Sequence, residues 1–362
     1  MEPQDPATTK RLRAFLNFEP MDRPALALFL GLFMPDVFPN LCARLPRGAI
    51  APDDIQVEPF LEDIELLCEK YSQLGDDVPY AVAPFIYMPW MEAIVGCPIF
   101  ASENSIWAEP AIRDWDDWEW KALDLAHNQW ARKLLELTDA LVKHSAGRYP
   151  VGQTLMRGVS DVLCAMRGAA SFTLDFIDHP EIMQRSVAFC ADAFVQVAKA
   201  QLRLIPSSEN GYVSSGAHRA WAPAPMVWLQ EDALGLMSPR LFRDFILPQD
   251  RRILQEFRHT GFHLHGTVPW AVEAFAAMPE LGVLNFCFES LQPNVEATFA
   301  GFRRIQELHK PLAAWKEFDG DCFWPWLERF LGELSPQGLL LEVTVHDLDE
   351  GHAVRESFGR LG

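Results

Sequence analysis

Short apolar runs alternate with longer amphipathic stretches along most of the chain. The runs at 25–30 and 339–345 are almost wholly apolar, as expected of strands that are covered on both faces. This alternation predicts parallel strands with helices on the outside. About eight such units in this length favour a single α/β barrel of the TIM type, (β/α)₈, over an open doubly wound sheet. The predicted strands or extended segments are 25–30, 80–88, 149–155, 211–216, 261–266, 283–289, 312–315 and 339–345.

The first residues are polar and lead into a predicted helix, which Thr8 or Thr9 can cap. We therefore expect an N-terminal helical extension over residues 1–24 and the barrel over residues 25–362. The longer predicted helices are 57–74, 118–144, 159–177, 181–204 and 238–259. No GxGxxG follows the first strand and no P-loop motif is present, so the sequence gives little support to dinucleotide or P-loop nucleotide binding.

The composition limits the kinds of partner that this protein is expected to bind. The chain is 49% hydrophobic, enough for a sizeable core, and its formal net charge of −19 argues against nucleic acid and anionic membranes as partners. No run is long and apolar enough to span a bilayer, and the acidic start does not resemble a signal peptide. The seven cysteines form no CxxC pair, which indicates reduced thiols and a cytoplasmic location. A homodimer remains an option.

His263 and His265 carry the clearest chemical signal. They lie on one face of a predicted buried strand, at its carboxyl end and directly before Gly266. Active sites of such barrels lie at the carboxyl ends of the strands, where Glu289 and His346 are also expected. Three histidines and a carboxylate suit zinc, and two histidines with one carboxylate also suit ferrous iron.

Each of these residues also has a structural interpretation. The two histidines could be core residues bonded to backbone carbonyls. Glu289 and Glu317 could cap the helices that follow them, and His346 could belong to an ordinary loop. Glu342 lies within an apolar strand, where we expect it to pair with an arginine or lysine.

Several segments resemble the uroporphyrinogen decarboxylase superfamily, including its corrinoid-linked methyltransferase branch. The resemblance covers nearly the whole chain. It rests on residues 11–24, on 90–96, on 149–158, on 231–248 (with Glu231, Asp232, Pro239 and Pro248) and on 263–266, which read His-Leu-His-Gly. It implies a (β/α)₈ barrel with the active site at the carboxyl mouth.

The resemblance also implies a zinc site. In the methyltransferase branch the last of these segments reads His-x-Cys-Gly, and its His and Cys bind zinc. The corresponding residues here are His263 and, by substitution, His265. The family's third ligand is a cysteine near the C-terminus, where the candidate here is His346. An all-imidazole site is harder and more Lewis-acidic than a thiolate site, so Zn²⁺ is expected and Fe²⁺ is an alternative.

The decarboxylase branch has arginines after the first strand that pair with propionates, and residues 28–35 here contain none. The sequence therefore favours a metal-dependent enzyme of the methyltransferase kind that acts on a small molecule. Asp232 and Glu289 are candidates for a general base or for orienting the ligands, and His218 is a further catalytic candidate. Arg157 could bind a carboxylate. The remaining substrate-binding candidates are Tyr87, Trp90, Trp228, Trp315 and Glu317, whose aromatic members could wall an apolar cavity.

Two other classes stay open. One is a metal-free decarboxylase or other carboxy-lyase that works through Asp232, His218 and Arg157. The other is a non-catalytic barrel that binds a ligand or a corrinoid-carrying partner. The chain lacks the DxHxxG run of cobalamin-binding domains, so any corrinoid must arrive on a partner protein.

Overall fold

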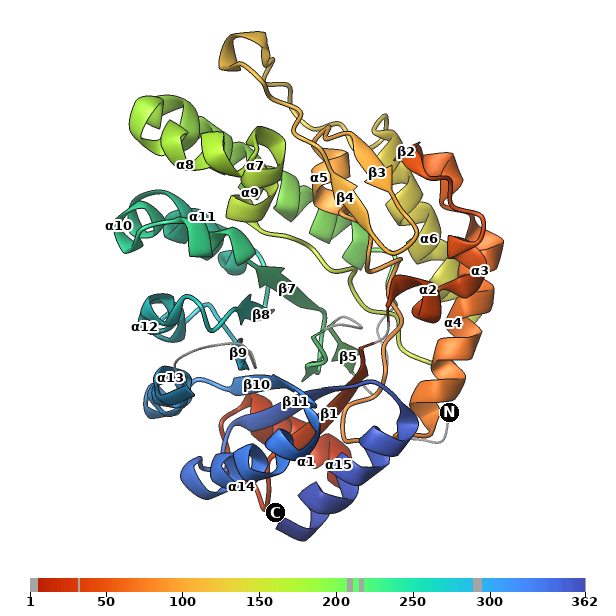
Figure 1. Cartoon of the computed structure of the whole chain (residues 1–362), viewed down its shortest axis with the longest axis vertical. Coiled ribbons are helices and arrows are strands. Elements are labelled where there is room, and N and C mark those ends of the chain that lie inside the picture. The colour runs from red at the N-terminus through yellow and green to blue at the C-terminus, as the bar shows by residue number, and fades with distance from the viewer. Residues whose placement is uncertain (1–5, 32, 207–210, 215–217, 289–294, 362) are drawn as a thin grey trace.

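A curved, six-stranded parallel sheet forms the centre of the protein. The computed structural model describes residues 6–31, 33–206, 211–214, 218–288 and 295–361. The strand order is β1-β11-β10-β9-β8-β7, so the first strand pairs with the last. These strands follow one another around a central space (Figure 1). Their bounds are β1 Ala25–Leu30, β7 Met226–Gln230, β8 His259–Leu264, β9 Val283–Phe288, β10 Leu312–Glu317 and β11 Leu339–Val345.

Two extended segments, within residues 77–82 and 151–157, lie between the free edges of β1 and β7. The parallel bridges Val82↔Val151 and Arg157↔Gln230 connect them, and the Asp77 N–H donates to the carbonyl of Leu26 in β1. The segments predicted as strands at 80–88 and 149–155 therefore form single bridges rather than ladders. Prolines such as Pro84 and Pro150 remove N–H donors from both. The expected α/β class and parallel curvature are present, whereas the parallel sheet of the described residues has six strands and not eight.

Helices cover the outside of this curve (Figure 1). The main ones are α1 Pro6–Leu16, α4 Val57–Ser72, α6 Gln129–Ser145, α7 Val159–Arg167, α8 Ala169–Asp178, α9 Pro180–Leu202, α11 Leu247–Gln255, α13 Val295–Glu307, α14 Phe323–Glu333 and α15 Leu348–Leu361. Shorter elements are α2 Met34–Val37, α3 Pro39–Cys42, α5 Trp90–Ile94, α10 Pro239–Leu241 and α12 Val272–Ala276. None of the helices in the described ranges is both long and apolar enough to cross a membrane.

Three predicted helices differ from the observed ones. The one expected over 118–144 begins at Gln129, where the Asn128 side chain accepts from the Ala131 N–H. The one over 159–177 divides at Gly168, whose φ is +82°. The one over 238–259 is interrupted by a π turn at Phe242–Ile246, before Pro248. The causes are local: the cap at Asn128 for the first helix, the positive φ of Gly168 for the second and Pro248 for the third.

The strand predicted at 211–216 was placed wrongly in the sheet. Its described part forms a small antiparallel hairpin, in which β5 Tyr212–Val213 pairs with β6 Trp221–Ala222. The strand that joins the parallel sheet in this part of the chain is β7, which is not among the predicted strands. A second antiparallel sheet contains β2 Gly48–Ile50, β3 Ile99–Ala101 and β4 Ile106–Ala108.

Candidate functional site

The carboxyl ends of β7 and β8 bring a carboxylate next to two imidazoles. Asp232, His263 and His265 each offer one ligand atom, and these atoms all lie within 4.8 Å of one another. Asp232 Oδ1 lies 3.2 Å from His265 Nε2. The strand register explains this meeting. Gln230 pairs with His263 across the two parallel strands, so the residues two positions further along, Asp232 and His265, are also neighbours.

Reciprocal helix capping holds the backbone on both sides of Asp232. The Glu231 carboxylate accepts from the backbone N–H groups of Val159 (2.5 Å) and Ser160 (2.7 Å), in the first turn of α7. In return, Asp161 in that turn accepts from the Ala233 N–H at 2.6 Å. Unpaired N–H groups at the start of a helix favour carboxylates in this way. The two caps fix the position of the Asp232 backbone.

Gly158 makes this arrangement possible. A Cβ at this position would lie 2.1 Å from Glu231 Oε1 and 2.6 Å from the Gln230 carbonyl oxygen. Gly158 lies in the segment 149–158, one of those that carry the family resemblance. Its role in the fold is to let the end of β7 approach the start of α7 closely.

A second buried carboxyl, Asp250 of α11, lies beside Glu231. Burial raises the pKa of both groups, that of Asp250 to about 8, and the neighbouring Asp250 charge raises that of Glu231 further. Glu231 accepts from two backbone N–H groups and from the Ser160 hydroxyl, which stabilises its ionised form.

His263 is buried and held by its neighbours. Its Nδ1 lies 2.5 Å from Asn285 Oδ1 on the adjacent strand β9. The His218 ring stacks on it with a centroid distance of 4.4 Å, and the Trp228 ring stacks on His218 at 5.4 Å. Burial lowers the pKa of His263 to about 4, and that of His218 well below its usual value. His263 is therefore a neutral imidazole at physiological pH, which is the form that binds metals.

Asp232 is ionised despite being partly buried. Burial opposes its charge, but the hydrogen bond from His265 and the neighbouring positive groups outweigh burial and lower its pKa. Its other oxygen, Oδ2, accepts from the Gln230 side chain at 3.0 Å. The site therefore presents one carboxylate and at least one neutral imidazole to the same small volume.

The structure does not bring His346 to this cluster. Its Nε2 lies 3.3 Å from Glu317 and its Nδ1 lies 3.0 Å from Glu350. Because β11 ends at Val345, His346 belongs to the turn before α15, and a carboxylate of that helix holds it. In the described structure the third ligand atom beside His263 and His265 comes from Asp232. The other carboxylate candidate, Glu289, lies outside the described residues.

Arg157 and the aromatic candidates divide into two groups. Arg157 forms an ion pair of 3.0 Å with the fully buried Glu92 and keeps 48% of its side chain exposed. Trp315 lies 6.1 Å from the His263 ring, and Trp228 belongs to the stack described above. The other two candidates pack elsewhere: the Trp90 indole donates to the Phe85 carbonyl, and Tyr87 packs against Phe38.

Two polar residues of the site were missed or misread in the sequence. Asn285 is not among the predicted site residues, although a polar residue in an apolar run is itself a signal. Glu342 was expected to pair with a basic side chain. It accepts instead from the Asn285 side chain at 2.6 Å and from the Arg219 backbone N–H at 2.7 Å.

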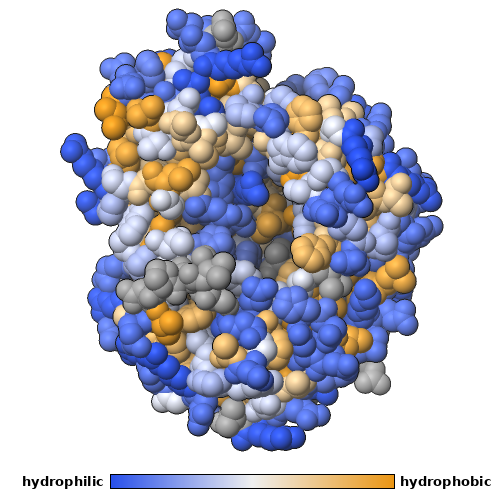
Figure 2. Space-filling view, in the orientation of Figure 1, coloured by the Kyte–Doolittle hydropathy of each residue, from blue (hydrophilic) through white to orange (hydrophobic). Residues whose placement is uncertain are grey.

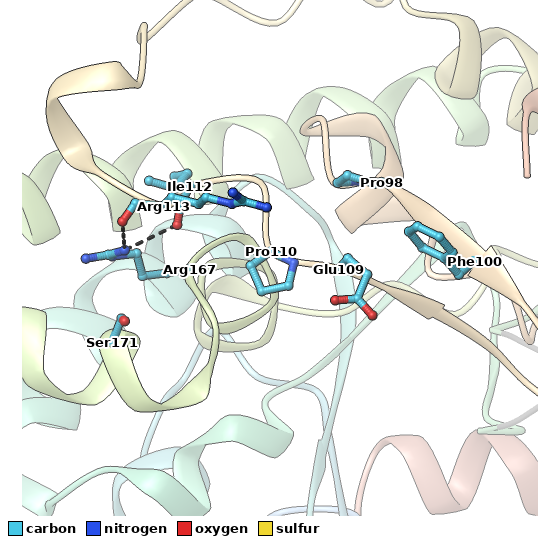
Figure 3. A pocket seen from close by; sticks show the side chains of 8 residues that line it. All are labelled: Pro98, Phe100, Glu109, Pro110, Ile112, Arg113, Arg167 and Ser171. Atoms are coloured by element: carbon cyan, nitrogen blue, oxygen red, sulfur yellow. Dashed lines mark hydrogen bonds between the residues drawn. The ribbon is translucent and has the colours of Figure 1, made fainter. Parts of the chain in front are cut away.

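The centre of the molecule is hollowed, with hydrophilic residues along much of the rim of the hollow (Figure 2). A separate surface pocket of about 630 Å³ lies beside α7 and α8, and none of the cluster residues lines it (Figure 3). The Arg167 guanidinium at this pocket already donates to Asp175 and to the carbonyls of Ile112 and Arg113. The pocket therefore adds nothing to the chemistry of the histidine cluster.

Comparison with known proteins supports the fold. No protein-family model matches the sequence, and no curated protein does. Among solved structures, a methyltransferase from Methanosarcina mazei superposes with a TM-score of 0.68 at 15% sequence identity, covering 98% of each chain. At this identity the likeness establishes a shared fold over the whole length of the chain.

Proposed function

We propose that this protein is a metal-dependent enzyme that transfers a methyl or related small group to or from a small molecule at the carboxyl mouth of the sheet. The observation that carries the proposal is the cluster of Asp232, His263 and His265. Two imidazoles and a carboxylate form a recurrent ligand set for zinc and for ferrous iron, and three protein ligands leave a position open. The fold that the chain shares with a methyltransferase is consistent with this proposal.

The residues present fit such an ion. Asp232, His263 and His265 would hold it, and when bound it would supply Lewis acidity, which lowers the pKa of an acceptor or polarises the substrate. The neighbouring residues prepare the site. Gln230 orients the Asp232 carboxylate through its 3.0 Å hydrogen bond. The stacked ring of His218 excludes water from one face of His263.

Two side chains extend the site toward a substrate. Trp315 is half-buried near His263, and its indole N–H donates to Thr344 at 2.7 Å, which fixes the orientation of the ring. Arg157 offers a half-exposed guanidinium that could bind a carboxylate of the substrate, and Glu92 holds it in place. A metal-free lyase would need Arg157 and His218 as its main groups. The first is already partly neutralised by Glu92 and the second is stacked within the protein, so we rank that function second.

The metal is tested by mass spectrometry of purified protein. We expect about one divalent ion per chain in the wild type, and loss of the ion in Asp232→Asn and in His263→Ala. His346→Ala is the matched control, because it removes an imidazole at the same end of the sheet but outside the cluster. Equal metal in all four proteins would refute the site. Loss of metal in His346→Ala and His263→Ala, with metal retained in Asp232→Asn, would restore the three-histidine expectation.

Group transfer is tested separately. Free methylcobalamin is supplied as the methyl donor with a panel of acceptors that includes thiols and water, and cobalamin demethylation is followed by its absorbance. The proposal expects turnover that depends on metal and is lost in Asp232→Asn. Demethylation that continues at the same rate in metal-stripped protein would refute metal dependence. Decarboxylation of carboxylate substrates by metal-free protein would support the lyase instead. A corrinoid-carrying partner protein, if one is required, would raise the rate obtained with free methylcobalamin.

A further inference from the structure

We propose that Glu342, acting through Asn285, determines which ring nitrogen of His263 carries the proton, so that Nε2 presents its lone pair at the mouth of the site. Both are positioning residues. The proposal extends the proposed function, since it concerns one of the three candidate ligands. It rests on hydrogen bonds that can be tested in metal-free protein.

The three side chains form a continuous line across the inside of the sheet. His263 and Asn285 are direct partners on β8 and β9. Asn285 then reaches across β10 to Glu342 on β11, and Ala313, its partner on β10, is small enough to leave room. All three polar residues are less than 5% exposed, so water does not compete for these hydrogen bonds.

The direction of the hydrogen bonds follows from the chemistry of each group. One Glu342 oxygen faces the Arg219 backbone N–H, and the other faces the Asn285 Nδ2. Above about pH 7 Glu342 is ionised and only accepts, so the Asn285 amide must point its NH₂ toward Glu342 and its oxygen toward His263. That oxygen can only accept as well. His263 must therefore carry its proton on Nδ1, and no hydrogen bond involves Nε2 among the described residues.

Arg219 anchors the far end of this line. Its side chain is 2% exposed, and its guanidinium forms a 2.7 Å ion pair with Asp76 and donates to the carbonyls of Leu28 and Val78. The backbone N–H that reaches Glu342 is therefore held in place, and it can only donate, so the Glu342 oxygen next to it must accept. Because His218 is the preceding residue, the same anchor also positions the ring that stacks on His263.

A substitution that reverses the polarity of the line should reverse the tautomer. In Glu342→Gln, the new amide oxygen must accept from the Arg219 N–H, so its NH₂ faces Asn285. The Asn285 amide then turns and donates to His263 Nδ1, and the ring proton moves to Nε2. Adding Asn285→Asp restores an acceptor next to His263, so the double variant returns the proton to Nδ1.

The test is long-range ¹H–¹⁵N NMR of histidine-labelled, metal-free protein at a pH well above 7, where Glu342 is ionised; the His263 signals are identified by their loss in His263→Gln. We expect the Nδ1–H form in the wild type, the Nε2–H form in Glu342→Gln and the Nδ1–H form in the double variant. The control is Asp175→Asn. It also changes a buried carboxylate to an amide, but this carboxylate binds Trp115 and Arg167 far from the line, so the tautomer should not change.

Zinc affinity, measured by competition with a chelator, gives a second readout. We expect binding to be roughly 10- to 100-fold weaker in Glu342→Gln and to recover in the double variant. A folded Glu342→Gln protein that keeps the proton on Nδ1 would overturn the inference. If that variant does not fold, Asn285→Leu decides instead, since removal of the acceptor should abolish the preference for Nδ1–H. A wild type without metal would refute the proposed function, while the tautomer measurements would still decide this inference.

Discussion

Gly261→Ala tests the packing beneath the candidate site. Gly261 is the partner of Trp228 across β7 and β8, and a Cβ at this position would lie 1.9 Å from Trp228 Cε3 and 2.1 Å from Cζ3. Such distances are far inside van der Waals contact, and the indole is only 2% exposed, so it has no empty space to enter. We expect the free energy of unfolding to fall by about 1–3 kcal/mol.

Thermal unfolding measures this effect. At an unfolding entropy of about 2.1 cal/mol/K per residue, a chain of 362 residues gives roughly 0.8 kcal/mol/K, so the Tm should fall by about 1–4 °C. Gly332→Ala is the matched control, because it lies in α14 and has no atom within 4 Å of the new Cβ. That control should gain about 0.5–1 kcal/mol from its better helix propensity.

A double-mutant cycle tests the cause. Trp228→Phe removes the fused six-membered ring that the new Cβ would meet, so Gly261→Ala with Trp228→Phe should be less destabilised than the sum of the single variants, by about 1–2 kcal/mol. Additive single effects would show that the two side chains do not collide. A stabilising Gly261→Ala would refute the packing argument completely.

Three further outcomes follow from the buried charges. Burial raises the pKa of Glu342 to about 7 from 4.5, so its contribution to stability is complete below about pH 4.5 and is lost as the pH rises through 7. Relative to Glu342→Gln, denaturant titrations of the wild type should therefore lose on the order of 3 kcal/mol across this range, and a constant difference would contradict this. Asp161→Ala should cost about 1–2 kcal/mol by removing the cap on the Ala233 N–H, with weaker metal binding; unchanged chemical stability would argue against the cap. Arg157→Met should cost about 3–5 kcal/mol because it leaves Glu92 buried without its partner, and adding Glu92→Gln should recover much of that loss; no recovery would mean that the ion pair is not the cause.

The parts of the fold that were predicted well are those with a strong local pattern. β1 and β11 have the predicted bounds, because a continuous apolar run between turns has few other interpretations. β7 was missed because Pro223 and Pro225 precede it, and a proline-rich stretch reads as a loop. The segment 211–216 has the composition of a strand, but its partner is the nearby β6, and local composition does not specify the partner.

In the candidate site, too, the features with a local pattern were predicted, and those that depend on a second segment were not. Alternation along one strand placed His263 and His265 on one face, and Asp232 was a candidate for a general base or for orienting the ligands. The contact between Asp232 and His265 depends on the register Gln230↔His263, which is a relation between two segments and leaves no trace in either one. Alternation also placed His346 in line with Thr344. The end of β11 and the carboxylates of Glu317 and Glu350 determine where that ring lies.

The pairing of β1 with β11 also affects how the protein is made. Ala25 pairs with Leu340, so the sheet cannot acquire this contact until more than 300 further residues have been synthesised. At about 5–20 residues per second, the ribosome needs roughly 15–60 s for that interval. During this time one edge of the nascent β1, which is apolar along its whole length, is not yet paired with β11. Contacts of such large sequence separation form late and expose aggregation-prone edges, so the yield of folded protein should depend on translation speed and on chaperones that shield the nascent chain.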